Sequence, residues 1–141
     1  MLAVNRYPKE YVDECRSRVA SHVSAYKKLA SAAAGEGSSL GAAVREFESV
    51  FFNNMVLVLE SYFTHRTRAL EKKDGNPLNE VRVMCNSMMH HDDIMTMDKS
   101  INLVPDKSVL KYQSGDRLAL TEEEFSRIAA AFFSEVESKY L

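Results

Sequence analysis

The stretch LGAAVREFESVFFNNMVLVLESYF, residues 40–63, carries the strongest structural signal in the chain. Apolar residues recur in it every three or four positions over about six turns, which is the spacing of one helix face. This stripe consists of Leu40, Val44, Phe47, Phe51, Met55, Val58 and Tyr62. A second row widens it, namely Phe52, Leu59, Phe63 and Leu70. The pattern therefore predicts a long helix buried on two sides, which ends among the cations of residues 65–73 before Gly75.

Three further segments have helical periodicity. The first, residues 11–30, follows Pro8 and ends in a Gly- and Ser-rich connection at residues 32–41. Another begins at Asn76 and Pro77, an N-cap followed by proline in the first turn, and the last begins with the capping-box pattern of residues 121–124. Between these two, short β-branched runs at residues 101–104, 109–112 and 117–120 are separated by turn residues, which is typical of a small hairpin. We therefore expect an all-α fold, a four-helix up-and-down bundle with a small β-hairpin between the third and fourth helices.

Composition limits the possible classes of protein. The 141 residues, 45% hydrophobic and 27% charged, predict a single globular domain over residues 1–141. A net charge of −2 provides no global basic field, so any nucleic-acid binding must be local. Cys15 and Cys85 form no CxxC pair, the N-terminus lacks the features of a signal peptide, and the most apolar run, residues 50–63, is too short to span a bilayer. These features predict a cytoplasmic protein with reduced cysteines and no membrane contact.

The densest polar cluster lies towards the end of the third predicted helix. It consists of Asn79, Arg82, Asn86, His90, His91, Asp92 and Asp93. Arg82 and Asn86 project from nearly the same side of a helix, with His90 about 80° away. Histidine can exchange protons and arginine can hold a phosphate, so this face could cleave a phosphodiester without a metal; an ordinary solvated face is the alternative.

No cofactor or metal site is predicted. The glycine-rich nucleotide-binding motifs, HExxH, GxSxG and the EF-hand loop are all absent from the sequence. Residues 90–93 cannot converge on one ion alone, because neighbouring helical residues point about 100° apart. His22 and His65 could add ligands only if the fold placed them nearby.

Three other features of the sequence indicate interactions with other groups or with a second chain. Glu60 lies inside the aromatic stretch, where a carboxylate calls for a buried partner, and Arg82 or another cation is a candidate. The basic residues 65–73 fit either phosphate binding or a solvated helix end. A homodimer is expected from aromatic residues in excess of what one small core needs, namely Tyr26, Phe52, Phe63, Phe133 and Tyr140.

Several segments together resemble the HEPN superfamily, the small all-helical domains of many prokaryotic RNase toxins and defence proteins. These are LESYF at 59–63, LNEVR at 78–82, CNSMMHHDD at 85–93 and YQSGDRLALT at 112–121. The family's catalytic motif is an arginine, commonly followed by a polar residue such as asparagine, with a histidine four to six residues beyond the arginine. Asn86 and His90 match it, but Cys85 stands at the arginine position, and Arg82 is the nearest substitute.

The resemblance implies a homodimer that binds or cleaves RNA without a metal, in a toxin–antitoxin or defence setting with an antitoxin or another protein as partner. His90 would act as general acid or base, Arg82 would stabilise the charge on the phosphorane, and Asn86 would orient the phosphate. The alternative is a catalytically silent helical interaction or dimerisation module, which Cys85 favours.

Overall fold

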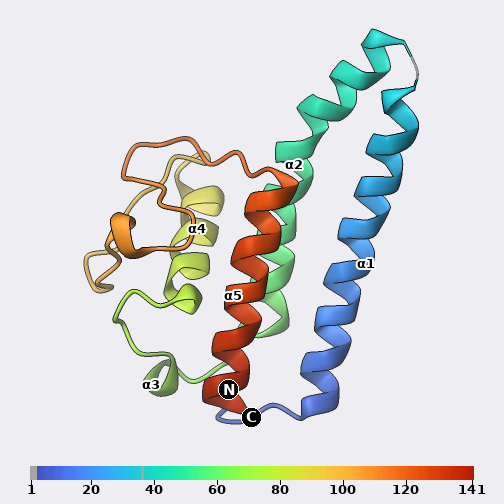
Figure 1. Ribbon diagram of the computed structural model, residues 1–141. Helices are drawn as coiled ribbons and strands as arrows, with labels where there is room; N and C mark the ends of the chain where they lie inside the picture. Colours follow the sequence, from blue (N-terminus) through green and yellow to red (C-terminus); the bar gives the residue numbers. More distant parts are fainter. Residues whose placement is uncertain (1–2, 36) are drawn as a thin grey trace.

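The computed structural model describes residues 3–35 and 37–141, without the side chain of Ser38, and is built from helices (Figure 1). They are α1 (Lys9–Ala34), α2 (Ser38–Tyr62), α3 (Arg68–Glu71), α4 (Pro77–His90) and α5 (Glu122–Tyr140), with one 3-10 turn, η1 (Pro105–Lys107). The all-α prediction is confirmed. Among the described residues, no helix combines the length and the apolar character that crossing a bilayer requires.

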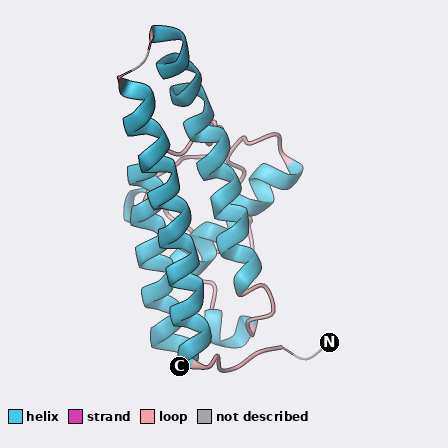
Figure 2. Cartoon of the chain, turned by 90° about the vertical axis from the view of Figure 1, so that its right-hand side faces the viewer, coloured by secondary structure: helices cyan, strands magenta, loops and turns pink. Residues whose placement is uncertain are grey.

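The helices α2 and α5 form the centre of the molecule. Both contact α1 on one side and α4 on the other, and consecutive long helices run in opposite directions (Figure 1). The α1–α2 end projects beyond the start of α5, as Figures 1 and 2 show from two sides. The small helix α3 lies beside the C-terminal part of α5.

The apolar faces of α4 and α5 lie in the core, and both predicted helix starts are confirmed. Asn76 caps α4 by accepting hydrogen bonds from the backbone of Leu78 and Asn79, and Thr121 forms a complete capping box with Glu124. On α2 the core takes residues from both predicted rows: Val44 and Met55 of the first row are buried, as are Phe52, Leu59 and Phe63 of the second. Leu40 and Phe47 of the first row are exposed, and Leu70 of the second row lies on α3 and is 37% exposed. Fully buried members of the core include Phe52, Leu59, Phe63, Leu78, Val81, Met84, Phe125, Ile128 and Phe132.

The aromatic residues from which a dimer was predicted are all buried within one chain, so that argument was wrong. Phe52 is covered by Tyr26 and Phe125, whose ring centroids lie 4.9 and 5.5 Å from its own. Phe63 contacts Phe133 in the same way, and Tyr140 is 1% exposed. These rings fill the space where α1, α2 and α5 pack against one another.

Two helix boundaries differ from the predictions. The helix α2 ends at Tyr62, because the N-terminal segment pairs with the following backbone: the Val4 amide donates to the His65 carbonyl and the Thr67 amide to the Val4 carbonyl. The connection predicted at residues 32–41 is shorter, since α1 continues to Ala34 and α2 begins at Ser38. Residue 36 of that connection and residues 1–2 of the N-terminal segment lie outside the described residues.

The predicted β-hairpin does not form. Residues 91–121 contain no strand ladder, only an isolated bridge between Ile94 and Arg117. Helix side chains satisfy the backbone groups that strands would have paired. Glu80 accepts from the amides of Val109 and Leu110 at 2.8 and 2.9 Å. In the same way the Asn53 side chain bonds the carbonyl of residue 118 and the amide of residue 120.

Candidate functional site

A buried ion network joins α3 to α4 and to the turn after α2. Its centre is the fully buried carboxylate of Glu71, which accepts from Arg66 Nε at 3.0 Å. Arg82 donates to it twice, from Nε at 3.0 Å and from Nη2 at 2.6 Å, and Asn79 Nδ2 donates at 2.9 Å. Burial alone raises the pKa of Glu71, but these donors and the two positive charges outweigh burial and lower it overall. Glu71 is therefore ionised at neutral pH.

Glu60 is the second carboxylate of the network and has fewer hydrogen-bond donors than Glu71. Its Oε1 is buried and lies 3.0 Å from Arg66 Nη1, yet it accepts no well-oriented hydrogen bond from the described residues. Burial raises the pKa of Glu60, and the charges of Arg66 and Arg82 only partly offset this effect. The sequence predicted Arg82 or another cation beside Glu60; the direct partner is another cation, Arg66, and Arg82 pairs with Glu71.

The loop between α3 and α4 is fixed by side chains of the network. Lys72 has φ 65° and ψ −176°, a conformation that residues other than glycine rarely adopt. Asn79 holds this loop by donating to the Lys72 carbonyl at 3.0 Å and accepting from the Gly75 amide at 2.9 Å. Asn76 Nδ2 also donates to the Glu71 carbonyl at 2.7 Å. The network thus determines where α4 begins relative to α3.

The three predicted catalytic residues lie on α4 but at different levels. Arg82 is half-buried in the first half of the helix, with its guanidinium directed at Glu71. Asn86 and His90 are exposed. His90 comes eight positions after Arg82, which is about 12 Å along the helix axis. Within one chain, the Arg82 guanidinium and the His90 imidazole are therefore not brought together.

Cys85, which stands at the arginine position of the HEPN motif, faces the core. It is 8% exposed, and its thiol lies 3.6 Å from the carbonyl of Val56 on α2. Burial raises the pKa of this thiol, and the nearby charge of Glu60 adds to the effect. Cys85 is a packing residue between α2 and α4, and Cys15 is likewise buried and free.

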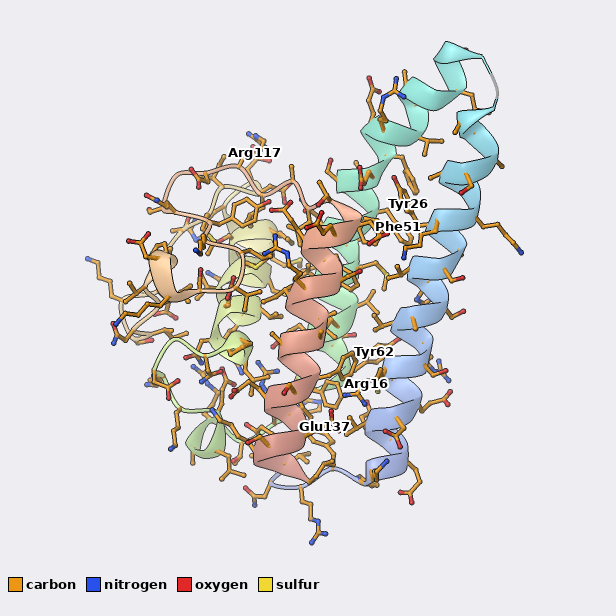
Figure 3. The ribbon with its side chains drawn as sticks, viewed as in Figure 1. Arg16, Tyr26, Phe51, Tyr62, Arg117 and Glu137 are labelled. Carbon is orange, nitrogen blue, oxygen red and sulfur yellow. The ribbon has the colours of Figure 1, made fainter. Side chains whose placement is uncertain are left out.

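A groove of about 460 Å³ lies between α2, the end of α4 and the loop before α5. Apolar side chains form much of its wall, and the large ones among them are Val50, Leu57, Met88, Met89 and Leu118. Val50 is 56% exposed and Met89 is 64% exposed, the highest values among the large apolar residues of the described chain. Its charged lining residues are Asp93 and Arg117, and Figure 3 shows Arg117 at the outer edge of the loop. We call this region the α2–α4 groove.

A second groove, of about 430 Å³, lies between α1 and α5, and the cations that line it are paired with carboxylates. Arg16 at one end pairs with Glu137 and lies over the Phe133 ring, and Figure 3 shows Arg16 and Glu137 pointing toward one another. Lys27 at the other end pairs with Glu122 at 3.4 Å. Both cations are thus already neutralised by carboxylates of α5.

The histidines do not assemble a metal site. His22 and His65 are exposed, as are His90 and His91. Across residues 3–35 and 37–141, no three His, Cys, Asp or Glu side chains come together in an arrangement suited to a metal.

The sequence analysis missed the two residues on which the network depends most. Arg66 and Glu71 lie in the segment interpreted as a basic cluster, where solvated cations or a phosphate site were expected. The signal that could have found them is Glu71 itself, an acid with cations three and five positions before it. Arg68, by contrast, has a 48% exposed side chain, as a solvated cation would.

Comparison of the chain with models of protein families, with curated proteins and with solved structures found no match. Function is therefore argued from the geometry of α2, α3 and α4 and from the motif in the sequence.

Proposed function

We propose that this chain is a helical dimerisation module that pairs through the α2–α4 groove. The proposal treats the four long helices as an up-and-down four-helix bundle of HEPN type that lacks the catalytic arginine. The observation that carries it is the exposure of Val50 and Met89 beside the groove, at 56% and 64%. Large apolar side chains gathered at one groove are typical of a contact surface.

The charges at the groove favour a second copy of the chain as the partner. Asp93 and Arg117 have opposite signs and line the same groove. In a two-fold dimer, the same surface of both chains forms the interface, so Arg117 of each chain can approach the partner subunit's Asp93. The dimer would then contain two such contacts. An apolar centre formed by Val50 and Met89, with paired charges at the rim, is the usual composition of such an interface.

The positions of Arg82, Cys85 and His90 favour a catalytically silent module over an enzyme. Stabilisation of a phosphorane requires a cation beside the general acid or base, but Arg82 lies about 12 Å along α4 from His90 within one chain, and Cys85 is a buried thiol. His90 alone leaves the motif incomplete.

RNA binding or metal-free cleavage is the second candidate, and the spacing of the motif along α4 favours it. Arg82 and His90 lie four positions to either side of Asn86. An antiparallel contact of two α4 helices centred on Asn86 would therefore place Arg82 of one chain opposite His90 of the partner subunit. A composite site of this kind would form only in the dimer.

Sedimentation velocity tests the dimer. We expect wild type to associate at tens of micromolar and Met89→Lys to remain monomeric, because the new charge would be buried at the contact. Leu29→Lys is the matched control, since Leu29 is also an exposed apolar residue, 46%, but lies on α1 away from the groove. A monomeric wild type, or a dimer equally weakened by both variants, would overturn the proposal.

Incubation of the protein with structured and single-stranded RNA in EDTA separates the two candidates. The silent module predicts no cleavage by wild type. Metal-free cleavage that is lost in His90→Ala, in Asn86→Ala and in Met89→Lys would instead establish the composite site.

A further inference from the structure

The end of α2 and the start of α4 form a second polar region, remote from the α2–α4 groove. The contact between Cys85 and Val56 fixes how the two antiparallel helices align. One turn further towards α3 along both helices lie Glu60 and Arg82. Glu60 comes ten positions after Val50, which is about 15 Å along α2. This region, Glu60 with Arg82, is here called the acid–arginine seam.

Glu71 orients the Arg82 guanidinium and leaves one of its terminal nitrogens without a hydrogen-bond partner among the described residues. Glu71 occupies its Nε and Nη2, which fixes the plane of the guanidinium. No described residue accepts a hydrogen bond from Nη1, and the side chain is 23% exposed. A guanidinium has five N–H donors, so the outward edge of Arg82 keeps donors for an anion. An anchoring carboxylate behind an arginine holds those donors in place before a ligand arrives.

Glu60 can change the charge of the seam. The formal charges of Glu60 and Arg82 and of the neighbouring Glu71 and Arg66 sum to zero when both carboxylates are ionised. The sum becomes +1 when Glu60 is protonated. Glu71 cannot easily take the proton, because four donors stabilise its ionised form. Glu60 accepts no well-oriented hydrogen bond at Oε1, and its side chain is 15% exposed. The charged or titratable groups that act on it are Arg66, Arg82 and Glu71, and it in turn affects Cys85 and Tyr7.

We propose that the acid–arginine seam binds the phosphate group of a ligand, with the outward edge of Arg82 donating to the anion and Glu60 taking up one proton as the anion binds. The proton comes from solvent and ends on the Glu60 carboxylate, so a repelling charge beside the anion disappears. Burial, which raises the pKa of Glu60, lowers the cost of this protonation. The site does not depend on the dimer proposed above.

Coupling to a proton gives the site a definite pH dependence. The anion binds best when Glu60 is protonated, so affinity falls as the pH rises through the pKa of Glu60. One coupled proton corresponds to about tenfold weaker binding per pH unit above that pKa. Sulfate is the appropriate first probe because it does not itself titrate in this range. A dinucleoside monophosphate then reports whether the site takes a phosphodiester of a nucleic acid or only a small free anion.

Calorimetric titration of the full chain with sulfate, from about pH 5 to about pH 8 at constant ionic strength, tests the proposal. Wild type is expected to bind more weakly as the pH rises and to take up protons, seen as a dependence of the heat on the buffer. Glu60→Gln keeps the shape but removes the charge, so its binding should not depend on pH, and its advantage over wild type should grow about tenfold per pH unit above the pKa of Glu60. Arg82→Lys keeps the charge but loses the planar edge, and should bind more weakly at every pH.

Two control variants make the outcome specific. Arg117→Gln removes an exposed cation outside the seam and should leave sulfate binding unchanged. Met89→Lys, which tests the dimer, should also bind sulfate as wild type does, so failure of one proposal is separate from failure of the other. Absence of sulfate binding, pH-independent binding by wild type, or unchanged pH dependence in Glu60→Gln would each overturn the proposal.

Discussion

Replacement of Glu71 by glutamine tests whether the buried ion network holds α3, α4 and the turn after α2 together. The substitution keeps the shape but removes the charge, and it turns an NH₂ group toward donors that already point at that site. Four donors now bind the carboxylate, three of them from Arg66 and Arg82. A hydrogen bond to a charged group contributes about 1.5–3 kcal/mol, and glutamine cannot satisfy all four donors. Losing about two such bonds gives about 3–5 kcal/mol, the usual cost of breaking a buried ion pair.

Urea unfolding followed by far-UV circular dichroism at neutral pH measures this difference in the free energy of unfolding. A loss of about 3–5 kcal/mol is a large part of the total stability of a typical domain, and corresponds to a fall in Tm of about 10–17 °C. Because the folded pKa of Glu71 is lowered, its contribution is present above the unfolded pKa of about 4.3 and is lost as the pH falls through the folded pKa. The difference between wild type and variant should therefore shrink in acid.

The matched control for this experiment is Glu123→Gln. Glu123 has an 85% exposed side chain and only a distant contact, 4.0 Å, to Arg127, so its replacement should change stability by less than about 0.5 kcal/mol. A loss below about 1 kcal/mol for Glu71→Gln, or equal losses for both variants, would refute the structural role assigned to the network.

Three further predictions concern stability. The pKa of Glu60 is raised in the folded protein, so its contribution to folding stability is present below the unfolded pKa and is lost as the pH rises through the folded pKa. In urea titrations, Glu60→Gln should therefore be more stable than wild type near pH 8 and equal to it near pH 4. A difference in stability that does not depend on pH would contradict this prediction. Gly75→Ala should cost more than Gly115→Ala in thermal unfolding: both glycines have positive φ, but only at Gly75 would a Cβ lie 2.4 Å from the Asn102 carbonyl oxygen. Equal losses at the two glycines would show that the clash relaxes freely. Thr121→Ala should lower stability by about 1 kcal/mol through loss of the α5 capping box, and an unchanged Tm would show that the box contributes nothing.

Local sequence patterns were sufficient for the helices α4 and α5. The cap at Asn76 and the capping box at Thr121 depend on residues within a few positions of one another, and both were predicted. The end of α2 could not be predicted in this way. It depends on Val4, sixty residues away, whose backbone pairs with His65 and Thr67.

The predictions of a β-hairpin and of a surplus of aromatic residues were wrong for the same reason, namely contacts between residues far apart in the sequence. Residues 101–120 have β-like composition, but Glu80 and Asn53 from distant helices satisfy their backbone, and no pattern within the segment shows this. The number of aromatic residues suggested an excess because the sequence does not show that Phe52 must fill space between three helices.

The candidate site was predicted in part. A partner for Glu60 was expected because an acid in an apolar helix requires one, but the choice of Arg66 depends on the turn after α2. Whether Arg82, Asn86 and His90 form a site depends on a second chain and stays a prediction.

A charge-exchange experiment at the α2–α4 groove tests the central proposal most directly. In the proposed two-fold dimer, Asp93 of each chain would approach the partner subunit's Arg117. Copies with Asp93→Lys should repel one another, as should copies with Arg117→Glu, whereas a mixture of the two restores opposite charges at both contacts. Circular dichroism confirms that each variant is folded, and sedimentation velocity then reports association. The account predicts monomers for each variant alone and dimers in the mixture. Dimers of either variant as stable as those of wild type, or a mixture that associates no better than its components, would contradict it.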